Sequence, residues 1–135
     1  MTFKNWRGGA SLGAAFSRTL AKSGARVIVA DIRGNMAEER LFKDVQTISL
    51  ADACDELGEV PKYVKMDIEG AEVATIQGSQ RFLSDHPIHF AIESYHRING
   101  ELTFKPLERL FRGIGYEVRS SNAFGQMFTW ADPRS

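Results

Sequence analysis

The sequence has only one cysteine, Cys54, so it cannot build an internal disulfide framework. A single thiol fits a reducing compartment. The chain also lacks an excess of charge of either sign, because 17 Lys and Arg residues balance 17 Asp and Glu residues. Without a net field that attracts nucleic acid or an anionic membrane, we expect the partner to be a small molecule or a protein.

Long apolar runs are missing as well. No run approaches the roughly 20 residues of a membrane span, and the first 13 residues lack the apolar core of a signal peptide. We therefore expect a cytoplasmic protein that does not enter the membrane. A length of 135 residues suits one domain, so we predict a single domain over 1–135.

What is present is an alternation of short apolar segments with amphipathic ones. Strands are predicted over 25–32, 45–50, 63–68 and 88–93, and helices over 14–24, 49–58, 70–84 and 105–115. Two closing strands, 116–121 and 126–131, flank a turn-prone segment. This order predicts an α/β fold: a mostly parallel sheet with helices on both faces and a C-terminal antiparallel hairpin.

Two details refine the predicted helices. Ser49 followed by Asp52 is the spacing of a capping box, and Gly58 supplies a stop for the short helix between them. The inward positions of the two longer helices follow from their apolar spacing. They are Val73, Ile76, Phe82 and Leu83 in the first, and Leu107, Leu110, Phe111 and Ile114 in the second.

Acidic residues close three of the predicted strands. Asp31 lies at the end of the strand over 25–32, Asp67 at the end of that over 63–68, and Glu93 at the end of that over 88–93. Ligands of open parallel sheets bind beyond the carboxyl ends of the strands, where these acids would converge. The alternative is that Asp67 and Glu69 only cap the following helix, while Glu72 complements its dipole.

The segment VKMDIEGAEVATIQG, residues 64–78, resembles the strand-to-helix signature of FkbM-type S-adenosylmethionine-dependent methyltransferases. The similarity extends upstream through VQTISLADACDELG and downstream through FAIESYHRINGELTFKPLERLFRGIGYEV and FGQMFTW. It covers about residues 44–131. The resemblance implies a Rossmann-like methyltransferase fold, in which 44–135 is the FkbM-like part and 1–43 a shortened or degenerate cofactor-binding part, so that the fold is incomplete.

The glycine-rich segment 8–13 is similar to the cofactor loop of methyltransferases, with Ser11 in place of the expected asparagine. It equally resembles the fingerprint of short-chain dehydrogenases, which bind NAD(P), with one glycine and a threonine missing. Both use small residues that let backbone amides approach a cofactor. A further alternative is that the true glycine motif lies upstream and the chain is the C-terminal part of a longer enzyme.

The resemblance implies S-adenosylmethionine as cofactor and a small molecule or sugar hydroxyl as methyl acceptor. It places the cofactor at Gly9, Ala10, Gly13, Asp31, Asp67 and Glu69. Asp67 and Glu93 would hydrogen-bond the acceptor hydroxyl, and the imidazole of His96 would serve as base.

Other functions stay open at this stage. The acids Asp67, Glu69 and Glu93 are oxygen donors of the kind that bind Mg²⁺ or Ca²⁺, but no dedicated spacing supports a metal site, and none is predicted. The apolar FGQMFTW segment suits the core, an acceptor pocket or a homodimer surface. The alternative from another class is a non-catalytic remnant or partner-binding α/β module.

Overall fold

The computed structural model describes residues 22–24 and 49–134, except 69 and 124. The chain divides into two compact units, Met1–Gln46 and Thr47–Ser135, and almost all the described residues belong to the second. The predictions for the glycine-rich segment and the strand over 25–32 therefore lie outside the described residues, as does most of the helix over 14–24.

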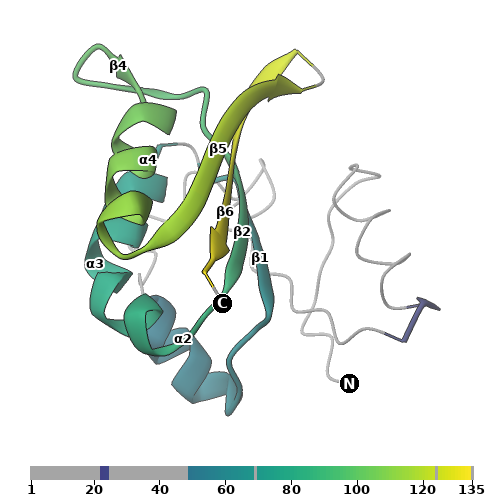
Figure 1. Cartoon of the computed structure of the whole chain (residues 1–135). Coiled ribbons are helices and arrows are strands. Elements are labelled where there is room, and N and C mark those ends of the chain that lie inside the picture. Colours follow the sequence, from purple (N-terminus) through teal and green to yellow (C-terminus); the bar gives the residue numbers. More distant parts are fainter. Residues whose placement is uncertain (1–21, 25–48, 69, 124, 135) are drawn as a thin grey trace, which may run out of the picture. The chain divides into compact units, whose positions relative to one another are not determined.

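The second unit combines three helices with a four-stranded sheet (Figure 1). The helices are α2 (Leu50–Leu57), α3 (Glu72–Asp85) and α4 (Phe104–Gly113). The strands of the sheet are β1 (Tyr63–Met66), β2 (His89–Glu93), β5 (Tyr116–Ala123) and β6 (Gln126–Pro133). Their spatial order is β1-β2-β6-β5. The predicted α/β class is confirmed.

The sheet is not mostly parallel. Only β1 and β2 run parallel, whereas β6 pairs antiparallel with both β2 and β5. For the described strands, the prediction of a mostly parallel sheet is wrong, because the C-terminal hairpin supplies half of the strands and joins β2 directly. The three helices lie on one face of this sheet (Figure 1), so helices on both faces are not confirmed for this part.

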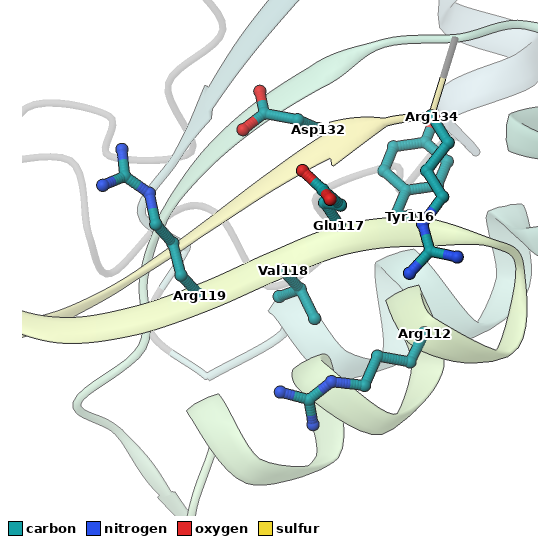
Figure 2. Close-up of a pocket in the computed structure, with 7 residues that line it drawn as sticks. All are labelled: Arg112, Tyr116, Glu117, Val118, Arg119, Asp132 and Arg134. Carbon is teal, nitrogen blue, oxygen red and sulfur yellow. The ribbon is translucent and has the colours of Figure 1, made fainter.

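The C-terminal hairpin is confirmed and is longer than predicted. Its register runs from Tyr116 opposite Pro133 to Ala123 opposite Gln126. An open depression of about 340 Å³ lies against this hairpin and the end of α4 (Figure 2). Its lining residues are Arg112, Tyr116, Glu117, Val118, Arg119, Asp132 and Arg134.

Local sequence signals account for α2. Ser49 Oγ accepts a hydrogen bond from Asp52 N at 3.0 Å, and Asp52 Oδ2 accepts one from Ser49 N at 3.4 Å. The helix ends at Gly58, whose φ of 67° is left-handed. The predicted capping box is confirmed. Ser49 and Leu50, by contrast, were predicted to end a strand, yet they form the cap and first residue of α2.

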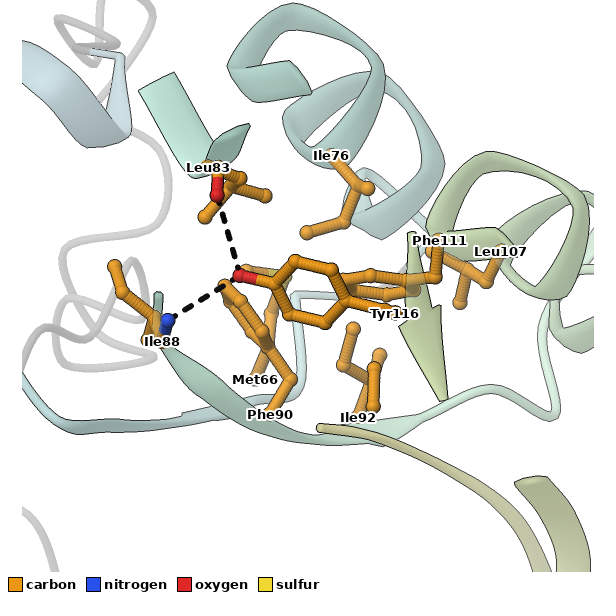
Figure 3. Packing of buried hydrophobic residues seen from close by; sticks show 10 residues of the cluster. Met66, Ile76, Leu83, Ile88, Phe90, Ile92, Leu107, Phe111 and Tyr116 are labelled. Carbon is orange, nitrogen blue, oxygen red and sulfur yellow. Dashed lines mark hydrogen bonds between the residues drawn. The ribbon is translucent and has the colours of Figure 1, made fainter. Parts of the chain in front are cut away.

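The core lies between the sheet and helices α3 and α4 (Figure 3). Every predicted inward residue of the two helices belongs to it or packs against it: Val73, Ile76, Phe82, Leu83, Leu107, Leu110, Phe111 and Ile114. From the sheet, Met66, Phe90 and Ile92 contribute. The Tyr116 hydroxyl accepts a hydrogen bond from Ile88 N at 3.2 Å and donates one to Leu83 O at 3.5 Å.

A short second sheet was not predicted. It pairs β3 (Arg97–Ile98) with β4 (Glu101–Leu102) around Asn99 and Gly100, whose φ angles are 52° and 83°. The Asn-Gly dipeptide is a strong signal for a tight hairpin turn, because both residues tolerate positive φ. The hairpin separates the end of β2 from the start of α4.

Candidate functional site

Asp67 and Glu93 lie at one edge of the sheet. The parallel register of β1 and β2 places Met66 opposite Ile92, so the acids that follow each of these residues stand at neighbouring carboxyl ends. The predicted convergence is therefore observed for this pair. The remaining residues of the predicted cofactor site lie outside the described residues: Gly9, Ala10, Gly13, Asp31 and Glu69.

The Glu93 carboxylate is fixed by an ion pair. Its Oε1 lies 2.7 Å from Nζ of Lys65. The Glu93 side chain is 13 % exposed and that of Lys65 is 52 % exposed. The half-exposed Lys65 side chain thereby holds the largely buried Glu93 carboxylate at the strand end.

Asp67 has an unusual electrostatic environment. Its side chain is exposed, yet surrounding protein atoms remove part of its hydration, and this raises the pKa of the carboxyl above its ordinary value. The charge of Glu93 raises that pKa further, and Glu72 adds to the effect, while Lys65 and His96 oppose it. Asp67 is thus a more basic carboxylate than a solvated one, and it can be reached from outside.

Glu72 is a further residue of this site, although its sequence position predicted only an interaction with the helix dipole. It begins α3, it is 0 % exposed, and its Oε1 accepts hydrogen bonds from Ile68 N at 3.0 Å and Gly70 N at 3.3 Å. The side chain therefore folds back over the loop between β1 and α3. The available signal was an acid in the first helical turn, two residues after a glycine that can take positive φ.

Gly70 allows the backbone to make this tight loop. Its φ is 102°, a conformation that side chains rarely adopt. A Cβ built on Gly70 would have the His96 Cβ as its nearest neighbour, at 3.9 Å. The loop after β1 and the segment after β2 are therefore in close contact at this point.

His96 is held against Glu72 by the segment after β2. Ser94 N donates to Met127 O at 2.8 Å, and Thr103 N donates to His96 O at 2.9 Å, so β6 and the start of α4 fix this backbone. The Nδ1 atom of His96 lies 3.5 Å from Glu72 Oε1, and the histidine side chain is 13 % exposed. Ligand atoms of Asp67, Glu72 and His96 all lie within 4.8 Å of one another.

The depression in Figure 2 is a separate feature. Its residues Glu117 and Asp132 are opposite each other in the pairing of β5 with β6. The residue before Asp132, Ala131, is paired with Phe90 near the start of β2. The acids lie instead at the carboxyl end of β2, where Glu93 is opposite Phe128.

Among the helices that the structure describes, none has the length and apolar character to cross a membrane.

Comparison with known proteins supplies the family. The model of the methyltransferase FkbM domain matches residues 3–118, which is most of the chain. The chain belongs to the FkbM methyltransferase family. No curated protein and no solved structure matches it. The resemblance carried by the segment 64–78 is confirmed.

The matched range differs from the one that the motifs suggested. It begins at residue 3, well before residue 44, and it ends at residue 118, within β5. The FkbM domain therefore includes the N-terminal third, where the motifs are weakest. It also contains Asp67, Glu72, Glu93 and His96, so the cluster at the sheet edge lies inside the family domain.

Proposed function

We propose that the protein is an S-adenosylmethionine-dependent methyltransferase that methylates a hydroxyl group of a small molecule or sugar. The observation that carries this proposal is the pair Asp67 and Glu93, which stands at the carboxyl ends of adjacent parallel strands within an FkbM domain. That edge is where open α/β sheets bind their ligands.

The chemistry requires positioning and one proton acceptor. The acceptor oxygen attacks the methyl carbon of the sulfonium, an O–C bond forms, and the S–C bond breaks to release S-adenosylhomocysteine. The hydroxyl proton goes to a protein base. Placing the oxygen about 3 to 3.5 Å from the methyl carbon supplies much of the rate increase, and a positioned base supplies the rest.

We assign the proton to Asp67. Its raised pKa makes it a better base than a solvated carboxylate, and its exposure lets an acceptor reach it. Glu93, held by Lys65, would hydrogen-bond and orient the acceptor. His96, the base proposed from the sequence, has its Nδ1 atom 3.5 Å from Glu72 Oε1 and is the second candidate for the base. Separate substitution of Asp67 and His96 distinguishes the two bases.

The cofactor site extends this proposal to the N-terminal third. Gly9, Ala10 and Gly13 would bring backbone amides to the methionyl part, Asp31 would bind the ribose, and Asp67 and Glu69 would complete the site. In this proposal 1–43 is a shortened cofactor-binding part and 44–135 completes a Rossmann-like methyltransferase domain. The protein would act on its small-molecule acceptor in the cytoplasm, alone or as a homodimer, without nucleic acid or membrane.

Ligand titration of the full chain tests the proposal. We expect isothermal titration calorimetry to give saturable binding of S-adenosylmethionine and none of NADH. Binding of NADH alone would favour a dehydrogenase-like domain instead. Binding of neither would favour a non-catalytic module.

Substitution of Asp67 tests the assigned site. Transfer of a labelled methyl group to a panel of hydroxylated acceptors should be lost in Asp67→Asn, with an unchanged far-UV circular dichroism spectrum. Asp132→Asn is the matched control, because Asp132 is an exposed acid at the far end of the sheet. If Asp67→Asn unfolds while its folded fraction keeps normal turnover, Asp67 is a helix cap and the assignment is wrong.

A further inference from the structure

The second carboxylate oxygen of Glu72 has no assigned role in the loop. Oε1 already accepts two backbone hydrogen bonds, but among the described residues Oε2 is buried without a hydrogen-bond partner. Burial of an unpaired carboxylate oxygen costs several kcal/mol, so such an atom is expected to meet a proton, a water molecule or a cation.

The groups around Glu72 match a cation ligand set. Asp67 follows β1, Glu72 begins α3 and His96 follows β2, and one ligand atom from each lies within 4.8 Å of the other two. Ligands that surround one ion at about 2.0 to 2.6 Å are separated by no more than about 4 to 5 Å. The three groups are therefore close enough to share one ion with small adjustments of their side chains.

The charges at this edge also favour a cation. Asp67, Glu72 and Glu93 bring three carboxylates together, and Lys65 balances one of them through its ion pair with Glu93. Glu72 and Glu93 both act on Asp67 as like charges. A divalent cation among them would remove this repulsion and occupy the unpartnered oxygen at the same time.

We propose that Asp67, Glu72 and His96 form a binding site for one divalent transition-metal ion. Two carboxylates and an imidazole favour Mn²⁺, Fe²⁺ or Zn²⁺ over Mg²⁺ and Ca²⁺, which prefer oxygen ligands throughout. Glu72 would ligate through Oε2 while Oε1 keeps its bonds to the loop, and the exposed Asp67 side leaves coordination positions open.

The site deepens the proposed function, and only this consequence rests on it. An ion with open positions would bind the acceptor hydroxyl and lower its pKa. An imidazole nitrogen that ligates an ion cannot also accept a proton, so His96 would become a ligand. The proton would then go to the second oxygen of Asp67.

Titration of the untagged full chain with Mn²⁺, followed by the electron paramagnetic resonance signal of the free ion, tests the site. We expect one saturable site in the wild type. Glu72→Gln keeps an oxygen for the loop amides but replaces the other ligand oxygen by an amide nitrogen. We expect it, Asp67→Asn and His96→Gln to weaken binding at least about tenfold.

Asp132→Asn is the matched control. Asp132 Oδ1 lies 2.7 Å from Nδ1 of His89, so the control removes a carboxylate beside a histidine where both side chains are half exposed. Its Mn²⁺ affinity should equal that of the wild type. Circular dichroism establishes whether each variant is folded. Because Asp67 is exposed, Asp67→Asn tests the site even if a change at the buried Glu72 unfolds the protein.

Two results would overturn the inference: no saturable Mn²⁺ binding by the wild type, or wild-type affinity in folded Asp67→Asn and His96→Gln. S-adenosylmethionine is titrated separately into the same samples. If the protein binds S-adenosylmethionine but does not bind Mn²⁺, only the ion site is rejected. If the protein binds Mn²⁺ but does not bind S-adenosylmethionine, only the proposed cofactor is rejected.

Discussion

Two acids five residues apart illustrate how strongly the surroundings decide the role of a residue. Asp67 is exposed at the end of a strand, and its neighbours make its charged form less favourable. Glu72 is fully buried and binds the loop that connects the two. The first is therefore accessible from solvent, whereas the second holds the backbone of the loop between them.

The ionised Asp67 carboxylate should lower the stability of the folded protein at neutral pH. Because its folded-state pKa is raised, the native protein binds more protons than the unfolded chain between the ordinary and the raised pKa. Stability then falls as pH rises through that window, and the loss persists above it. We expect Asp67→Asn to remove this loss, so that its melting temperature exceeds that of the wild type at pH 7 but not below the ordinary aspartate pKa. Melting curves across this pH range check it, and a wild-type advantage at pH 7 would contradict it.

Glu72 should be needed for the loop as well as for a ligand. Glu72→Ala leaves the amides of Ile68 and Gly70 without their acceptor and opens a buried cavity. We expect the free energy of unfolding to fall by about 1 to 3 kcal/mol. Urea denaturation followed by circular dichroism measures it. Glu72→Gln retains the acceptor oxygen and should lose less, and equal losses in the two variants would show that the hydrogen bonds contribute little.

At the scale of elements, one tyrosine joins three of them. Tyr116 begins β5, and its hydroxyl bonds the backbone of Leu83 in α3 and of Ile88 just before β2 (Figure 3). Its ring packs against Phe111 of α4, with centroids 5.4 Å apart. The start of the hairpin is thereby tied to the helix layer and to the central strand.

The hydroxyl of Tyr116 should therefore be measurable in stability. Tyr116→Phe keeps the ring but leaves the buried Ile88 amide without its acceptor. We expect a loss of about 1 to 3 kcal/mol in the free energy of unfolding. Chemical denaturation gives the value, and Tyr63→Phe is the control, because Tyr63 is 56 % exposed. Equal stabilities of Tyr116→Phe and the wild type would show that the hydroxyl is not a structural link.

At the scale of the whole molecule, the family domain spans both compact units. The match begins at residue 3 and passes the division between Gln46 and Thr47. The acids described here belong to the second unit, while the proposed glycine contacts belong to the first.

Cofactor binding should stabilise the full chain by mass action. At a concentration of about 100 times its dissociation constant, S-adenosylmethionine should add about 2.7 kcal/mol to the free energy of unfolding. Thermal unfolding with and without the cofactor tests this, with NADH at equal concentration as the control. An unchanged melting temperature at saturating S-adenosylmethionine would exclude binding to the native state.

The periodic and local signals in the sequence predicted the elements well. Apolar spacing identified the inward faces of α3 and α4, and the Ser49–Asp52 capping box placed the start of α2. These features depend on residues a few positions apart, which the chain alone specifies. These signals did not predict the directions of the strands in the sheet. The antiparallel pairing of β6 with β2 joins segments that are separated in the sequence by α4 and β5.

The sequence by itself determined the family motif, the α/β class and the presence of acids at strand ends. Only the tertiary structure decided which of these residues meet. The position of Glu72 in the first helical turn did not reveal that its side chain is buried, because the burial depends on the turn at Gly70 and on His96, which lies in the segment after β2. Short-range patterns fix helices and strands, whereas a ligand site needs distances between segments that only the folded chain sets.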